Sequence, residues 1–207
     1  MGNELSQHVE QSKKTGVLQL RNFKLTQVNF ILIKWPNMFK KFTLQIKKNK
    51  VPNEILPITQ FLRNLDLSNN KIKQLPNQLF IKTQLLKTLN LSNNKIELLP
   101  NEISLLAKLE TLNLSENLLV QLPNSLGSLK NLKQINLSKN NFRCIPKELA
   151  QIQQLDHLDL SSNKIERVED YVENLSCIEI NLNENQVKYL SANIAKCQRL
   201  KVIKFKI

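Results

Sequence analysis

The residues best suited to acid–base chemistry surround His157, which stands between Asp156 and Asp159. An imidazole exchanges protons near neutral pH, and a neighbouring carboxylate can orient it. However, adjacent residues of a strand point to opposite faces, so Asp156 and His157 would face apart. No activated nucleophile stands beside them. The sequence therefore predicts no active site, and we expect the protein not to be an enzyme.

Metal and cofactor chemistry has no support in the spacing of the other reactive residues. Cys144, Cys177 and Cys197 form no CxxC pair, and His8 and His157 have no spacing typical of metal ligands. Neither GxGxxG nor GxxxxGK[ST] occurs, and the chain has only three Gly. We expect no metal and no cofactor. The odd cysteine count and the lack of an N-terminal apolar segment favour reduced thiols in the cytoplasm.

A modification signal stands at the start of the chain. Met1-Gly-Asn-Glu-Leu-Ser6 fits the pattern M-G-x-x-x-[ST], in which the amino group of Gly2 receives a myristoyl chain. The nearby Lys13 and Lys14 favour an anionic membrane surface modestly. The pattern is short and is equally compatible with an unmodified start. We expect a cytoplasmic protein that a lipid anchor on Gly2 attaches to membranes.

A repeated pattern, LxxLxLxxNxLxxLP, dominates the rest of the chain. Its six copies begin 24, 23, 23, 23 and 22 residues apart, at Leu62, Leu86, Leu109, Leu132, Leu155 and Cys177. The fifth copy has Glu169 in place of proline. A less regular copy begins near Val17, and Leu200 opens another that stops at Ile207. The pattern resembles the 23-residue class of leucine-rich repeats of intracellular proteins.

The physical content of one copy predicts the fold class. The L-x-L pair alternates with period two, which is typical of a short strand with one buried face. The asparagine falls where the chain leaves the strand, and the proline stands at a helical start. One copy cannot bury its leucines alone, whereas stacked copies can. We therefore predict an α/β solenoid with a parallel sheet on the concave face and short helices or turns on the convex face.

The strand residues that flank the leucines should face outward from the sheet and form the binding surface. Of eighteen such positions in the six regular copies, three are acidic and none is basic. Phosphate binding needs Lys or Arg, so we expect no nucleic acid on this face. We predict an unidentified protein partner; solvent-exposed consensus positions are the alternative. The candidate partner face comprises Asn64, Asp66, Thr88, Asn90, Thr111, Asn113, Gln134, Asn136, His157, Asp159, Glu179 and Asn181.

The net charge of +13 lies outside the regular copies. Residues 51–195 hold fifteen basic and fifteen acidic side chains, whereas 28–50 contribute +6, 196–207 contribute +5 and 1–27 contribute +2. A basic peripheral membrane or nucleic-acid binder that uses 28–50 and 196–207 is therefore the alternative function. Next to an acylated Gly2, the lysines of 34–50 would supply the second signal that stable membrane binding requires.

The chain divides into four predicted parts: an acylation segment (1–15), an atypical first repeat (16–27), a basic segment (28–50) and the leucine-rich-repeat domain (51–207). The basic segment has two interpretations. It is either a degenerate repeat around Leu44 and Ile46, or an insertion of intron origin. The second interpretation rests on the repeat spacing, because removing 28–50 would join Gln27 to Val51 and restore the ordinary distance between strands. The unfinished last unit indicates a truncated C-terminus, and we expect its last strand to be apolar and exposed.

Short segments outside the repeat pattern also resemble a known group. They are the initial MGN, His8–Glu10, Lys14–Val17, Ile178–Gln186 and Cys197–Lys201. Through these segments the chain resembles small intracellular leucine-rich-repeat proteins that begin with Met-Gly. The similarity covers residues 1–27 and 51–207. The resemblance implies a cytoplasmic repeat protein that associates with membranes through an acyl group, and it brings no defined biochemical activity.

Overall fold

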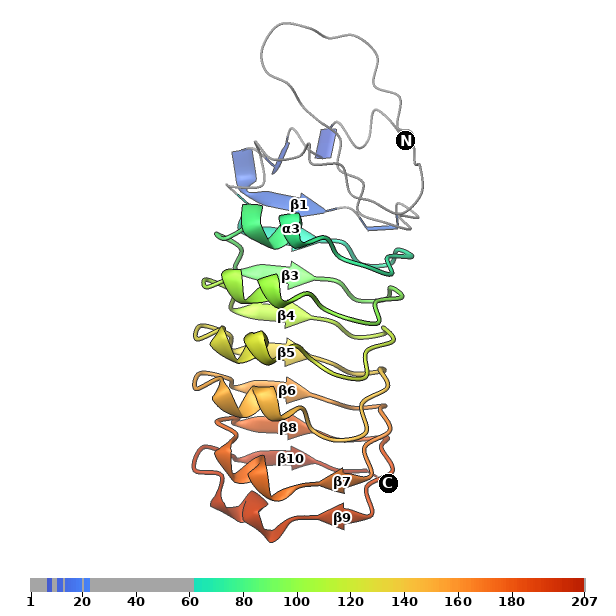
Figure 1. The fold of residues 1–207 in the computed structure, drawn as a ribbon, viewed down its shortest axis with the longest axis vertical. Coiled ribbons are helices and arrows are strands. Elements are labelled where there is room, and N and C mark those ends of the chain that lie inside the picture. The colour runs from blue at the N-terminus through green and yellow to red at the C-terminus, as the bar shows by residue number, and fades with distance from the viewer. Residues whose placement is uncertain (1–6, 9–10, 13, 20, 23–61, 207) are drawn as a thin grey trace, which may run out of the picture.

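A parallel sheet forms one face of the molecule. The computed structural model describes residues 7–8, 11–12, 14–19, 21–22 and 62–206. Eight strands within these ranges stack in chain order (Figure 1): β1 (Val17–Gln19), β2 (Asn64–Asp66), β3 (Thr88–Asn90), β4 (Thr111–Asn113), β5 (Gln134–Asn136), β6 (His157–Asp159), β8 (Glu179–Asn181) and β10 (Val202–Lys204). Each repeat contributes one three-residue strand, as the L-x-L pattern predicts.

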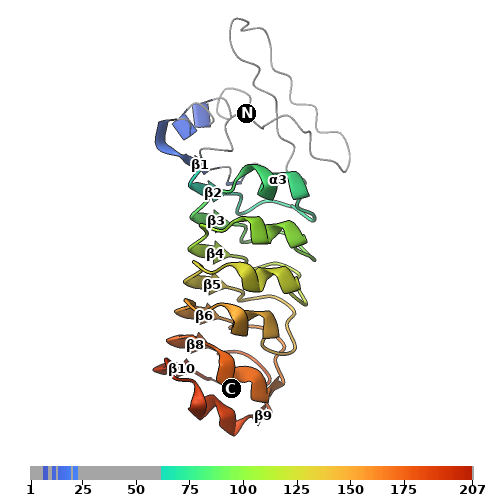
Figure 2. The same cartoon turned by 60° about the vertical axis from the view of Figure 1, so that its left-hand side comes forward.

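Short helical turns cover the opposite face (Figure 2). They are α3 (Asn77–Lys82) and the 3-10 helices η1 (Asn101–Leu105), η2 (Asn124–Ser128), η3 (Lys147–Gln151), η4 (Asp170–Asn174) and η5 (Ala192–Lys196). Proline precedes each of the first four because its fixed φ suits a helical start. Glu169 and Ser191 take this place before η4 and η5. Each of these helical elements is only five or six residues long, so the convex side of a repeat is about one tight turn.

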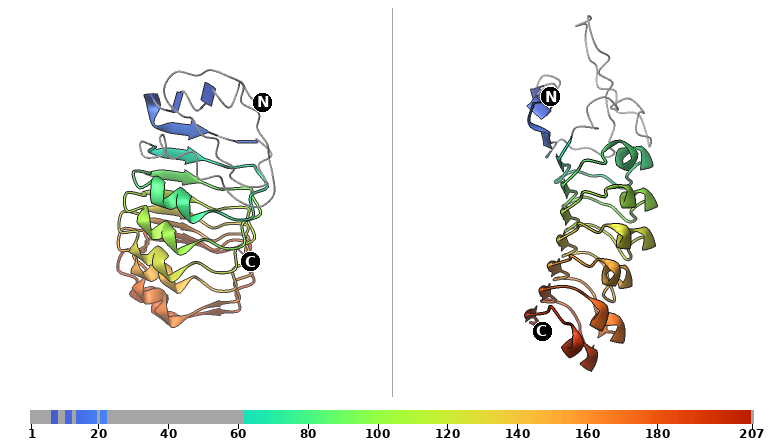
Figure 3. Two further views of the ribbon diagram at one scale, coloured as in Figure 1. Left: turned by 45° about the horizontal axis from the view of Figure 1, so that its top comes forward. Right: turned by 90° about the vertical axis from the view of Figure 1, so that its left-hand side faces the viewer.

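Two edges join the sheet to the helical face, and Figure 3 shows both faces of the stack. On the strand-end edge, the chain leaves the strands through 71–75, 95–99, 118–122, 141–145, 164–168 and 186–190. A second, two-stranded parallel sheet lies here, formed by β7 (Arg167–Val168) and β9 (Tyr189–Leu190). On the strand-start edge, the chain returns through 83–87, 106–110, 129–133, 152–156, 175–178 and 197–201.

The core is a stack of equivalent side chains. Leu89, Leu112, Ile135 and Leu158 pair in register across neighbouring strands, and each is at most 2% exposed. Burying such a side chain contributes roughly 1.5–3 kcal/mol, so the repeated leucines are the main stabilising term. The predicted fold class, a solenoid with a parallel sheet backed by short helices, is confirmed.

Each buried asparagine joins two repeats. The Nδ2 of Asn117 donates to the carbonyls of Leu91, Leu114 and Ser115 at 3.0, 3.1 and 3.1 Å. Its Oδ1 accepts from the Ile96 N–H at 3.0 Å. These bonds satisfy backbone groups in the interior, which would otherwise be costly to desolvate. Equivalent bonds are made by Asn94, Asn140, Asn163 and Asn185.

The two ends of the described sheet differ in their packing. Leu18 of β1 lies opposite Leu65 of β2, although 47 residues separate them (65 minus 18). These two strands are direct neighbours, so no strand stands between them in the described sheet. At the other end, β10 pairs only with β8, and Val202, Ile203 and Phe205 are 43%, 38% and 42% exposed. The predicted exposure of the last strand is confirmed.

Several sequence predictions lie outside the described residues. Gly2 and the basic segment 28–50 belong to this group, so the two interpretations of 28–50 stay predictions. Of the predicted acylation segment, residues 7–8, 11–12 and 14–15 are described and have helical backbone. No helix in the described ranges is long and apolar enough to cross a bilayer.

Candidate interaction face

The outward side chains of the strands form two parallel columns on the sheet. The middle residue of each strand from β1 to β6 and of β8 is buried, whereas Ile203 in the middle of β10 is partly exposed; the flanking residues point away from the core. The first column consists of Asn64, Thr88, Thr111, Gln134, His157, Glu179 and Val202. The second consists of Asp66, Asn90, Asn113, Asn136, Asp159, Asn181 and Lys204. The predicted partner residues therefore share one face, and β10 extends it by one more pair.

The second column has a structural duty. The Oδ1 of Asn113 accepts the N–H of Ser115 at 3.0 Å, and the Oδ1 of Asn136 accepts the N–H of Ser138 at 2.9 Å. Asp66, Asn90, Asp159 and Asn181 make the same bond to the residue two positions on. Each side chain thus closes the turn that follows its strand. These bonds explain the Asn/Asp preference, for which the sequence had suggested either partner binding or solvent-exposed consensus positions.

This bond fixes which group faces outward. Because the amide oxygen is held by the turn, the NH₂ group of Asn113 and of Asn136 points away from the backbone. Neither NH₂ group has a partner within the described residues, whereas the NH₂ of Asn90 donates to Asp66 at 3.1 Å. The middle of the column therefore presents hydrogen-bond donors.

Asp66 belongs to a local network instead of an open surface. It is only 8% exposed and binds Arg21 at 2.6 Å and Ser68 at 2.7 Å. Burial alone would raise the pKa of Asp66, but hydrogen bonds from Ser68, Arg21 and Asn90 outweigh it and hold the pKa below its usual value. We therefore exclude Asp66 from the contact surface. Arg21 lies outside the six regular copies, so sequence reasoning missed it.

The other end of the face is hollowed into a pocket of about 350 Å³ lined by β4, β5, β6, β8 and β10. Glu179 lies between Lys204 and His157 there: the Nζ of Lys204 is 2.5 Å and the Nδ1 of His157 3.4 Å from its carboxylate. The hydrogen bond from Lys204 lowers the pKa of Glu179 and, reciprocally, raises the pKa of Lys204. The pocket thus combines neutral donors with a short row of charges.

Lys204 corrects the charge pattern expected for this face. The six regular copies contain no basic residue at these positions, but β10 contributes one to the pocket. Its repeat is incomplete, so the repeat pattern gave no reason to count it. The sequence alternation Lys201-Val-Ile-Lys204 would have placed Lys204 on this face, had β10 been treated as a full strand.

Two of the four other basic residues of segment 196–207 form ion pairs within the described residues. Lys196 binds Glu173 at 3.3 Å, and Arg199 binds Asp156 at 2.6 Å. Arg199 also donates to the Ser176 carbonyl at 3.0 Å. With Lys204, three of the five basic residues are engaged within the fold. The alternative function through 196–207 therefore has less free charge than the sequence suggests.

The structure places Asp156 and His157 on different sides of their strand. His157 faces Glu179, while Asp156 binds Arg199 on the strand-start edge, as strand alternation predicts. Burial raises the pKa of Cys177 to about 12 and also raises that of Cys197, which disfavours the nucleophilic thiolate form at both positions. Within the described ranges, no three His, Cys, Asp or Glu side chains are grouped to hold a metal ion.

The comparisons with known proteins bear directly on the repeats. The family model described as a leucine-rich repeat region matches residues 17–206. The chain belongs to the leucine-rich-repeat family. Proteins of this family are generally non-enzymatic scaffolds. No curated protein sequence matches the chain significantly.

Solved leucine-rich-repeat structures have the same architecture. A leucine-rich-repeat protein of Leptospira interrogans is 30% identical, with a TM-score of 0.63 over 77% of this chain and 42% of its own. Listeria monocytogenes InlP is 25% identical, with a TM-score of 0.61 over 73% and 41%. An internalin from the same organism shares the fold at 18% identity, with a TM-score of 0.56 over 72% and 50%. The chain thus spans half or less of these structures.

Proposed function

We propose that this leucine-rich-repeat protein is an interaction scaffold that holds a protein partner on the sheet face, centred on the pocket between β4 and β10. The observation that carries the proposal is that five successive strands direct side chains into one hollow. In that hollow the NH₂ groups of Asn113 and Asn136 are unused by the fold. Hydrogen-bonding groups that a partner covers must be satisfied by that partner, and this requirement gives specificity.

The chemistry of the face defines the partner. Asn113 and Asn136 offer donors, and Glu179 and Asp159 offer carboxylates, whereas the lining holds no Trp, Tyr or Phe. Aromatic anchors usually dominate tight interfaces, so binding here depends on polar groups and bridging water. A suitable partner presents backbone or side-chain carbonyls to the asparagines and a basic group near the carboxylates.

The test uses the first column, because its residues close no turn. Thr111→Lys/Gln134→Lys adds two cations to the pocket and removes no hydrogen bond that closes a turn. Asn101→Lys/Asn124→Lys makes a matched change on the helical face, at the first residues of η1 and η2. Proximity labelling in cells would compare both with the wild type. We expect specific partners to disappear only with the sheet-face variant; retention in that variant, or equal loss in both, contradicts the proposal.

We also propose that a myristoyl group on Gly2 brings the scaffold to membranes. The support is the M-G-x-x-x-[ST] start and the similarity of the quoted segments to leucine-rich repeat-containing protein 57. Fractionation and labelling with a clickable myristate analogue would compare Gly2→Ala with the control Asn3→Ala. We expect only Gly2→Ala to lose the label and to move from the membrane to the soluble fraction. Equal membrane fractions for the two variants would remove the lipid hypothesis.

A further inference from the structure

Three large apolar side chains are exposed on the strand-end edge. Leu98, Leu118 and Val120 are 58%, 44% and 58% exposed. The Leu118 N–H donates to the Ile96 carbonyl at 2.9 Å, so the two segments that carry them lie side by side. At the position of Leu118, other copies of the repeat have polar residues: Lys71, Lys95, Asn141 and Lys164. The repeat pattern therefore does not require these apolar residues.

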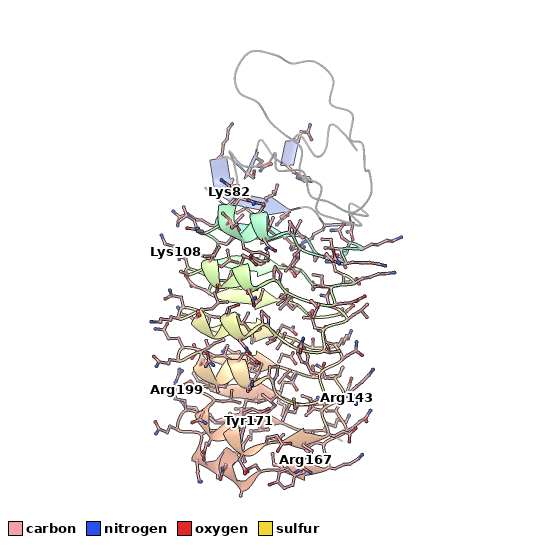
Figure 4. The ribbon with its side chains drawn as sticks, in the orientation of Figure 1. Lys82, Lys108, Arg143, Arg167, Tyr171 and Arg199 are labelled. Atoms are coloured by element: carbon pink, nitrogen blue, oxygen red, sulfur yellow. The ribbon has the colours of Figure 1, made fainter. Side chains whose placement is uncertain are left out.

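Basic side chains surround the three apolar ones. Lys71 and Lys73 lie on the preceding segment of the edge, and Lys95 lies on the segment of Leu98. Arg143 follows, and Figure 4 shows it at the edge opposite Lys82 and Lys108. In the described part of the chain, none of Lys71, Lys73, Lys95 and Arg143 forms an ion pair. One acidic residue, Glu97, lies among them, and the neighbouring Lys139 is neutralised by Glu116 at 2.9 Å.

This combination identifies the kind of surface that fits. Exposed apolar side chains favour a site that removes them from water. Three of them form a small patch, well below the roughly 20–30 residues per side of a stable protein interface. Apolar residues that insert shallowly, ringed by lysines that meet anionic headgroups, are typical of proteins that lie on a membrane.

We propose that the strand-end edge at Leu98, Leu118 and Val120 docks on an anionic phospholipid surface, with Lys71, Lys73, Lys95 and Arg143 contacting the headgroups. The inference deepens the membrane part of the proposed function, but it rests on folded residues and does not depend on the acyl group. It places the second membrane signal on the solenoid itself. The pocket opens on the sheet face, around the corner from this edge, so a docked molecule keeps it accessible.

A nucleic acid is the other polyanion to consider. Proteins that bind single strands without sequence preference combine cations with aromatic side chains for base stacking. On this part of the edge the nearest aromatic, Phe142, is 1% exposed and unable to stack. Binding through the lysines alone would not need the leucines. The apolar residues therefore separate the two partners experimentally.

The experiment uses unacylated full-length protein and vesicles of phosphatidylcholine with or without phosphatidylserine, measured by co-sedimentation at increasing salt. Leu98→Ser/Leu118→Ser/Val120→Ser removes the apolar contact, and Leu105→Ser is the control on the helical face, at a leucine 39% exposed. Lys71→Ala/Lys73→Ala removes charge, with Lys108→Ala/Lys130→Ala as the matched pair on the strand-start edge. Circular dichroism would verify that every variant is folded.

We expect phosphatidylserine-dependent binding that weakens at least ~10-fold in the triple serine variant, and ~5-fold per lysine removed at Lys71 and Lys73. The Leu105 variant and the Lys108/Lys130 variant should bind like the wild type. Absence of vesicle binding by the wild type overturns the proposal. Equal losses of vesicle binding for the two lysine pairs also overturn it. So does a result in which the triple serine variant binds both RNA and vesicles as well as the wild type. Because no acyl group is present, this result is independent of Gly2.

Discussion

At the scale of single residues, two kinds of asparagine do different work in each repeat. Asn117 is 5% exposed and hydrogen-bonds to backbone groups of its own and the preceding repeat. Asn113 stands on the surface and closes the turn after β4 with its Oδ1, leaving its NH₂ outward. The same residue type therefore satisfies buried backbone groups at one position and presents an outward NH₂ group four residues earlier.

This difference leads to a prediction for Asn117→Ala. The substitution leaves the Ile96 N–H and the carbonyls of Leu91, Leu114 and Ser115 without their buried partner. We expect it to lower the free energy of unfolding by about 2–4 kcal/mol. Urea unfolding followed by circular dichroism would measure it. Asn124→Ala, at the exposed first residue of η2, is the control, and its free energy of unfolding should stay within about 0.5 kcal/mol of the wild type. Similar losses in both variants would contradict the stabilising role of the buried asparagines.

At the scale of elements, the helical turns stack as closely as the strands do. Gly127 of η2 is buried, and a Cβ built on it would lie 2.8 Å from the Cβ of Gln151 in η3. Neighbouring turns here therefore approach too closely for a methyl group. The equivalent residues in η1 and η3, Ser104 and Ala150, are also small. The close spacing of the helical turns thus restricts these positions to small residues.

We predict that Gly127→Ala destabilises the protein, although alanine ordinarily favours a helix over glycine by about 0.5–1 kcal/mol. The clash with Gln151 should dominate and lower the free energy of unfolding by about 1–3 kcal/mol. Thermal and urea unfolding would measure the loss. A double variant with Gln151→Gly removes the opposing Cβ and should recover much of it. A neutral or stabilising Gly127→Ala would show that the helical turns can separate at little cost.

At the scale of the whole molecule, burial is uneven along the stack. The middle strands have a neighbour on both sides, so Leu112 is fully buried, whereas Ile203 at the equivalent position of β10 is 38% exposed. In a solenoid each repeat contacts only its neighbours, so local stability follows the number of neighbours. The edge at Leu98, Leu118 and Val120 lies on repeats that have a neighbour on both sides, whereas the pocket extends to β10 at the less buried end of the sheet.

This difference in burial predicts that shortening a side chain to alanine lowers the free energy of unfolding more in β4 than in β10. Leu112→Ala should lower the free energy of unfolding by about 2–5 kcal/mol, because it leaves a cavity between two strands. Ile203→Ala removes partly solvated atoms and should cost about 1 kcal/mol or less. Urea denaturation gives both values, and hydrogen exchange would show faster opening at β10 than at β4. Equal costs would mean that β10 is covered in solution.

The sequence by itself determined the repeat and most of its consequences. Local alternation identifies Leu112 as buried and Thr111 and Asn113 as outward, and the periodic asparagines locate the turns. These features can be predicted from the sequence because each depends on residues a few positions apart. The same reasoning excluded an Asp156–His157 pair, since strand alternation separates neighbours. The same alternation groups the candidate partner residues on one face.

Only the tertiary structure decided how distant segments meet. It placed Leu18 beside Leu65, brought Arg21 to Asp66, and added Lys204 to the pocket. It also showed that the Oδ1 of the surface asparagines is held by the turns and that Leu98, Leu118 and Val120 gather on one edge. These facts depend on strand register, side-chain orientation and exposed area, which arise when repeats stack. A local pattern determines what each repeat is, whereas the stacking determines which of its groups remain free.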